Sequence, residues 1–114
     1  MSGKRDKIKD KDRFSILTPG FKRCYVCGTT EDLHIHEVFG GANRAKSKEW
    51  GLTVSLCGYH HNLSKSGIHF NKELDNIVKQ QAERYWMMEY CDDNLSEEEK
   101  IEKFIEVFGK NYID

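Results

Sequence analysis

The 114-residue sequence lacks several features that would assign it to a broad class at once. No apolar run approaches the roughly 20 residues that cross a bilayer, which excludes a membrane-spanning helix. The net charge is only −1, which excludes the uniformly basic surface of many tight nucleic-acid binders. Residues 1–13 alternate basic side chains with Asp and lack the apolar stretch of a secretory signal. The sequence therefore predicts a soluble, cytoplasmic protein.

Repeats and long linkers are also absent, and what remains indicates one small globular domain. Hydrophobic residues make up 38% and charged residues 32%, a balance typical of folded chains. We expect residues 1–13 to form a flexible charged tail and residues 14–114 a single domain. A domain this small needs a staple besides its apolar core. In the reducing cytoplasm, the four cysteines are expected to bind metal rather than form disulfides.

Alternating apolar and polar residues predict two strands. Short β-like pieces occupy residues 14–39, and the clearest of them is Leu33–Phe39, which ends at Gly40 and Gly41. Leu52–Leu56 alternates in the same way and runs directly into Cys57. The polar stretch between them, residues 42–49, is predicted to be a loop.

Helical periodicity predicts two helices near the C-terminus. The first begins at the N-cap Asn71 and ends at about Tyr90. Its apolar face is expected to contain Leu74, Ile77, Val78, Tyr85 and Met88. The second helix covers about residues 97–109, because Ser96 and Glu99 form a capping box and Gly109 ends the periodic pattern. Its apolar positions are Ile101, Phe104, Ile105 and Phe108. The aromatic stretch Tyr85–Met88 is more typical of core packing than of base stacking.

Two pairs of metal-ligating residues have the spacing of a zinc site. Cys24 and Cys27 form a CxxC motif followed by a glycine, and Cys57 and His60 form CxxH after the second strand. Three thiolates and one imidazole suit tetrahedral Zn²⁺. A redox CxxC would require a βαβ context that this pair lacks, and His61 is an alternative fourth ligand. Cys91 has no partner at metal spacing and receives no role.

The five histidines all lie within 36 residues, around the zinc motif. His34 and His36 lie two apart on one strand and so share a face, whereas Glu37 points to the other face unless a bulge intervenes. Phosphodiester hydrolysis requires a base that activates water and a cation that neutralises developing charge. A neutral imidazole such as His36 can be the base, and His34, His61 and His69 are candidate ligands of a divalent cation.

Basic residues are concentrated in the first half of the chain. Residues 1–50 carry 11 Lys or Arg against 7 Asp or Glu, and residues 51–114 carry 7 against 12. Contacts with nucleic acid must therefore be local or depend on a metal ion. Arg44, Lys46 and Lys48 between the strands are candidate phosphate contacts, although a solvated loop explains these charges equally well.

These motifs together resemble a known enzyme family. The CxxC pair, the run His36-Glu37-Val38-Phe39-Gly40-Gly41-Ala42-Asn43-Arg44, and the run Leu56-Cys57-Gly58-Tyr59-His60-His61-Asn62 are similar to HNH endonucleases of bacteriophages and prophages. The similarity continues through Gly67-Ile68-His69-Phe70-Asn71 to Phe108-Gly109-Lys110-Asn111-Tyr112, so it covers about residues 22–113.

The resemblance implies an α+β fold of the ββα-metal (HNH or His-Me finger) type, with a zinc-knuckle staple and two C-terminal helices. It implies that His36 is the signature histidine of the first strand, that His61 binds the catalytic cation, and that this cation is Mg²⁺ or Mn²⁺. In this family the strand usually carries a cation ligand followed by the base, but here the pair is His36-Glu37. Either His36 is the base, or His36 is a ligand and Glu37 occupies the base position; the shared strand face favours the first. The central asparagine of the HNH motif is also missing, with Gly51 or Leu52 near its place.

The function predicted from the resemblance is metal-dependent hydrolysis of DNA in a bacterial host cell. No base-reading element stands out in the sequence, which predicts weak sequence preference. The alternative is a non-catalytic zinc-binding adaptor for nucleic acid or protein, for example a subunit of phage DNA packaging or recombination machinery. The histidines beyond the zinc motif favour the enzyme, because an adaptor has no use for them. The sequence leaves the oligomeric state open.

Overall fold

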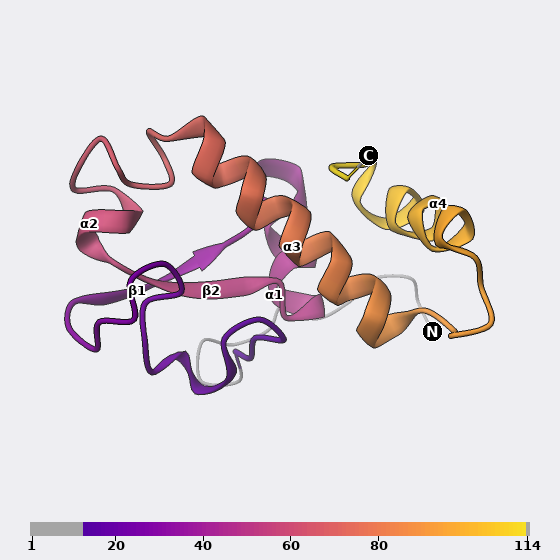
Figure 1. Ribbon diagram of the computed structural model, residues 1–114, viewed down its shortest axis with the longest axis horizontal. Coiled ribbons are helices and arrows are strands. Elements are labelled where there is room, and N and C mark those ends of the chain that lie inside the picture. The colour runs from indigo at the N-terminus through magenta and orange to yellow at the C-terminus, as the bar shows by residue number, and fades with distance from the viewer. Residues whose placement is uncertain (1–12, 114) are drawn as a thin grey trace.

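The computed structural model describes residues 13–113, and its fold is α+β, as predicted (Figure 1). A two-stranded antiparallel sheet is followed by two long helices, and short helices lie between and directly after the strands. In chain order the elements are η2 (Pro19–Phe21), β1 (Leu33–Glu37), η3 (Gly41–Asn43), α1 (Arg44–Trp50), β2 (Thr53–Cys57), α2 (Gly58–His61), α3 (Lys72–Tyr90) and α4 (Glu97–Phe108). No helix in this part of the chain is long and apolar enough to cross a membrane.

The two strands form the sheet in a register that pairs Leu33 with Cys57 and Glu37 with Thr53. Both predicted strands are confirmed, although β1 ends two residues earlier and β2 starts one residue later than expected. Every residue of β2 is buried, whereas β1 is only partly buried. The predicted charged tail lies outside the described residues except for Arg13.

The stretch predicted as a polar loop between the strands is instead the helix α1. Its alanine, lysines and glutamate have high helix propensity, but its lack of apolar periodicity concealed the helix. The buried Ser47 anchors it, because its hydroxyl donates to the Phe39 carbonyl (2.7 Å) and accepts from the Phe39 N–H (3.0 Å). Gly51 ends the helix at a φ of 72°, a left-handed conformation that suits glycine.

The ends of α3 and α4 are set by the predicted caps. The Asn71 side chain accepts a hydrogen bond from the Leu74 N–H (3.1 Å) at the start of α3. Ser96 and Glu99 form the reciprocal capping box of α4, which ends at Gly109 in the left-handed region. These local signals specify both helices, as predicted.

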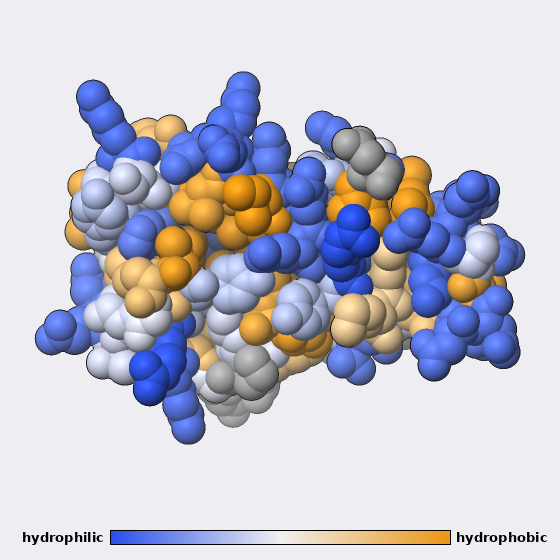
Figure 2. Space-filling model, in the orientation of Figure 1, coloured by the Kyte–Doolittle hydropathy of each residue, from blue (hydrophilic) through white to orange (hydrophobic). Residues whose placement is uncertain are grey.

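The apolar face predicted for α3 is only partly correct, because Val78 is buried and Leu74 packs against the core but the other three members are largely at the surface. Ile77, Tyr85 and Met88 are 43%, 39% and 72% exposed, and Figure 2 shows apolar side chains gathered on the surface over the first half of this helix. The buried side chains of α3 are Val78, Ala82, Glu83, Trp86 and Met87. The buried face includes a glutamate and an alanine, so hydropathy alone pointed to the neighbouring stripe.

Aromatic side chains from separate segments form the centre of the core. Phe39, just after β1, packs against Phe104 and Phe108 of α4 and against Tyr112, with ring centroids 5.1–5.6 Å apart. Trp86 of α3 packs on Phe104 at 5.5 Å. These contacts hold the end of β1, the strand that carries His34 and His36, against the two C-terminal helices.

A buried carboxylate holds the C-terminal segment against α3. Glu83 is fully buried, and its Oε1 accepts from the Tyr112 N–H at 2.7 Å, while its Oε2 has no hydrogen-bond partner. Burial raises the pKa of this carboxyl above its ordinary value of 4.5. A carboxyl group whose pKa is raised by folding destabilises the folded state as the solution pH rises above its ordinary pKa, which is the pKa it has in the unfolded chain.

We therefore expect Glu83→Gln to make the protein more stable at neutral pH. Glutamine can still accept from Tyr112 and carries no charge. The free energy of unfolding of the native protein, relative to the variant, should fall as pH rises from about 4.5 through the raised pKa, and then stay constant. Urea denaturation of both zinc-loaded proteins at several pH values measures this difference. A stability difference that does not change with pH would contradict the raised pKa of Glu83.

Candidate metal centres

The two cysteine motifs lie in the segment before β1 and the segment after β2, which meet at the same end of the sheet. Cys24 and Cys27 lie in a turn before β1, in which the Gly28 N–H donates to the Cys24 carbonyl (2.9 Å) and Gly28 has a φ of 79°. Cys57 is the last residue of β2, and His60 lies one turn further on in α2. The antiparallel pairing places the start of β1 beside the end of β2, so the two motifs meet.

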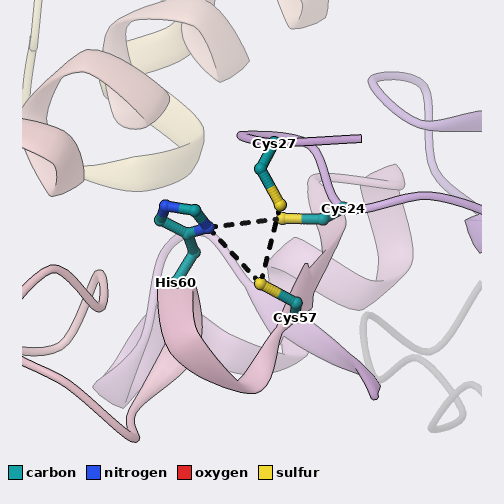
Figure 3. A group of neighbouring side chains, drawn as sticks. All are labelled: Cys24, Cys27, Cys57 and His60. Carbon is teal, nitrogen blue, oxygen red and sulfur yellow. Dashed lines mark hydrogen bonds between the residues drawn. The ribbon is translucent and has the colours of Figure 1, made fainter. Parts of the chain in front are cut away.

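The four donor atoms have the separations of a tetrahedral metal site (Figure 3). Cys27 Sγ lies 3.8 Å from Cys57 Sγ, and His60 Nδ1 lies 3.4 Å from Cys57 Sγ and 3.9 Å from Cys24 Sγ. Zinc bond lengths and tetrahedral angles predict about 3.5–3.8 Å between ligand atoms. The predicted ligands are therefore brought together, and the cluster could hold a metal ion such as zinc.

The surroundings of the cluster favour the thiolate form of Cys24 but not that of Cys57. Burial opposes ionisation of Cys24, but backbone groups of Cys27, Cys57 and Val26 lower its pKa to about 6. Burial and the neighbouring thiols raise the pKa of Cys57. Three thiolates crowded together need a cation to compensate their charge, which the chemistry of zinc supplies. Cys91 is buried at the end of α3 and is not part of this cluster.

We expect the native protein to bind one Zn²⁺ per chain and Cys27→Ser to lose it. Structural zinc contributes about 10–16 kcal/mol in zinc-finger peptides, which is comparable to the about 5–15 kcal/mol that stabilises a whole domain. Chelation or the serine variant should therefore abolish cooperative thermal unfolding, as measured by zinc analysis and circular dichroism. Cys91→Ala is the matched control and should retain zinc. Unchanged zinc content in Cys27→Ser would contradict the site.

A second cluster consists of three histidines from different elements. His36 comes from β1, His61 from α2 and His69 from the loop before α3, and their ring centroids are 4.7–5.4 Å apart. His61 Nε2 and His69 Nε2 are separated by 3.0 Å. One nitrogen of each ring can be chosen so that all three lie within 4.8 Å of one another. The three imidazoles could therefore hold a metal ion.

Backbone hydrogen bonds fold the loop onto α2 and so bring His69 to His61. The N–H groups of Ile68 and His69 donate to the carbonyls of His60 and His61, at 2.8 and 3.3 Å. Gly67 makes this approach possible, because a Cβ at this position would lie 2.7 Å from the His61 carbonyl oxygen. The loop conformation therefore completes the cluster.

His36 is the buried member of the histidine cluster. Its side chain is 7% exposed, and its Nε2 has no hydrogen-bond partner. Burial, together with the nearby His69, His61 and Lys79, lowers the pKa of His36 to about 3. The imidazole is therefore neutral at physiological pH and has a free lone pair, which is the form that binds metal ions.

The other predicted residues of the first strand lie outside this three-histidine cluster. His34 lies on the same face as His36 but contacts the opposite nitrogen of His61, with the two Nδ1 atoms 3.0 Å apart. The Glu37 carboxylate forms ion pairs with Arg13 Nη2 (3.1 Å) and Lys48 Nζ (3.8 Å). Both basic side chains belong to segments that flank β1, and the carboxylate that they hold is not a member of the three-histidine cluster.

A cleft of about 440 Å³ opens beside the three-histidine cluster. Of the three candidate phosphate contacts, Arg44 lines this cleft. Lys46 donates to the Val107 carbonyl (2.6 Å) and Lys48 pairs with Glu37 (3.8 Å), and neither is part of the lining. Sequence analysis missed Lys79 and Asp75, which also line the cleft and form an ion pair of 2.8 Å one turn apart on α3. Their i, i+4 spacing was the available signal, but such pairs are common on exposed helix faces.

Comparison with known proteins adds no relative. No family model, no curated protein and no solved structure matches the chain.

Proposed function

We propose that this protein is a divalent-metal-dependent endonuclease of the ββα-metal type that hydrolyses phosphodiester bonds in DNA. The observation that carries the proposal is the three-histidine cluster in an open cleft, next to a separate cluster suited to structural zinc. A structural site with four protein ligands is saturated, whereas three ligands leave positions for water and substrate. The order of β1, β2 and α2 agrees with the ββα arrangement of the HNH resemblance.

His36, His61 and His69 are the proposed ligands of the catalytic cation. Such a cation neutralises charge on the scissile phosphate and lowers the pKa of a bound water. The exposed His69 and half-buried His61 leave one side of the cluster open to solvent, while the buried His36 closes the other. A substrate phosphate can therefore approach from the open side.

The His36-Glu37 pair allows two assignments of the base and the cation ligand. The three-histidine cluster supports the assignment in which His36 is a ligand. A base with a pKa of about 3 removes a proton from water inefficiently, but a neutral buried imidazole is a good ligand. Glu37 then occupies the base position, and its residue lines the same cleft. The ion pairs with Arg13 and Lys48 hold its carboxylate in one orientation.

Purified protein should nick supercoiled plasmid in the presence of Mg²⁺ or Mn²⁺ and be inactive after the cation is removed. We expect His36→Ala to lose both cleavage and cation affinity. Glu37→Gln should reduce the cleavage rate by about 10²–10⁴-fold, the usual contribution of a general base, while cation affinity is unchanged. Zinc content and thermal unfolding show that each variant is folded.

The possible outcomes distinguish the nuclease function from the roles assigned to His36 and Glu37. Undiminished cleavage by Glu37→Gln would overturn its role as the base but leave the nuclease intact. If the folded, zinc-loaded native protein fails to cut DNA with every cation tested, the nuclease proposal is overturned and the zinc-binding adaptor is favoured.

Arg44 and Lys79 are the proposed phosphate contacts, because both are basic and line the cleft. We expect Arg44→Gln to weaken DNA binding and to reduce the slope of log affinity against log salt by about 0.9, since one phosphate contact is lost. Lys46→Gln is the matched control, because Lys46 already contacts the Val107 carbonyl outside the cleft lining. Fluorescence anisotropy with a labelled duplex measures both. Equal slopes for the two variants would contradict the role of Arg44.

A further inference from the structure

We infer that His34 and Asp32 are positioning residues that set the proton position on His61 so that its Nε2 binds the cation. The inference rests on the cation site of the proposed function and changes the role of His34, which the sequence suggested as a ligand. It follows from two contacts, which join Asp32 to His34 and His34 to His61 in a chain.

His61 contacts two other imidazoles through opposite nitrogens. Its Nδ1 lies 3.0 Å from His34 Nδ1, and its Nε2 lies 3.0 Å from His69 Nε2. The two nitrogens of one imidazole point in different directions, so both cannot bind the same ion. An ion shared with His69 is bound by Nε2, and His34 then lies on the side of His61 that faces away from the ion.

The Asp32 carboxylate determines which nitrogens of His34 and His61 carry protons. Asp32 Oδ1 is 3.1 Å from His34 Nε2, and an ionised carboxylate only accepts hydrogen bonds, so His34 Nε2 carries the proton. A neutral His34 then has its lone pair on Nδ1, which accepts the N–H of His61 Nδ1. His61 in turn keeps the lone pair of Nε2 free for the cation. Such partners of ligating histidines orient the ring and raise its basicity.

The backbone around Asp32 is arranged to hold its carboxylate in this place. Asp32 has a φ of 50°, a left-handed conformation that Asp tolerates better than most residues, and its carbonyl accepts from the Gly58 N–H at 3.0 Å. A Cβ on Gly58 would collide with Asp32 Oδ2. Glycine as the first residue of α2 therefore leaves room for the carboxylate beside His34.

The test compares His34→Leu with His34→Asn, two side chains of nearly equal shape. The asparagine carbonyl can accept the His61 Nδ1–H, whereas leucine cannot. His34 and Asp32 are 32% and 62% exposed, so water partly replaces a lost partner and binding should be weakened rather than abolished. We expect His34→Leu to weaken cation binding by about 10-fold, at the low end for such partners, and His34→Asn to bind almost as well as the native protein.

Ni²⁺, which prefers imidazole ligands, is the probe. Full-length protein loaded with one equivalent of Zn²⁺ is titrated with Ni²⁺ in a calorimeter, and zinc content is measured afterwards to confirm that the cysteine site is unchanged. His69→Ala, which lacks a proposed ligand, is the control for binding at the three-histidine cluster. Equal Ni²⁺ affinity of His34→Leu and the native protein would overturn the inference, as would a native protein that binds no Ni²⁺.

A second measurement keeps the inference testable if His34→Leu does not fold. The ¹⁵N chemical shifts of the histidine rings in the native, zinc-loaded protein report which nitrogen of His61 is protonated. We expect the proton on Nδ1, and a proton on Nε2 would overturn the inference. Neither readout uses DNA cleavage, so a protein that binds Ni²⁺ as expected but cuts no DNA would overturn the nuclease and leave the role of His34 standing.

Discussion

The four-donor cluster of Cys24, Cys27, Cys57 and His60 is the constraint on which the rest of the site depends. It joins the turn before β1 to the helix after β2, and α2 has only four residues. A helix this short is not stable alone, because the cost of nucleation exceeds the few hydrogen bonds it forms. A metal ion bound to His60 would fix α2, and the next residue, His61, would be fixed with it.

This adjacency explains how so small a chain can bring together two clusters of potential metal ligands. His60 and His61 are neighbours on α2 but project in different directions, one toward the cysteines and the other toward His36 and His69. The same sheet then serves both clusters, since Cys57 ends β2 and His36 lies within β1. A metal ion held by the cysteine cluster would therefore also restrict the position of His61, through the peptide bond that joins it to His60.

The aromatic core has the complementary task at the other end of the sheet. Phe39 follows β1 directly and is held by Phe104, Phe108 and Tyr112, so the C-terminal helix and the segment after it secure the histidine strand. Lys79 of α3 lines the cleft beside the three-histidine cluster. The C-terminal helices thus contribute both to the packing behind the strand and to the charge of the cleft. Their burial of Glu83, a carboxylate with one unpartnered oxygen, is a cost in stability that the core has to offset.

The sequence by itself determined those features that depend on neighbouring residues. The caps at Asn71 and Ser96, the two strands and the pairing of CxxC with CxxH follow from local hydrogen bonds, alternation and ligand spacing, and each could be predicted. Only the tertiary structure decided which face of α3 is buried, because that face is selected by partners distant in sequence such as Phe104. It also separated His34 from His36, which share a strand face and look equivalent in sequence. Their difference arises from what lies opposite each ring: the exposed Asp32 beside His34, and a buried space shared with two imidazoles beside His36.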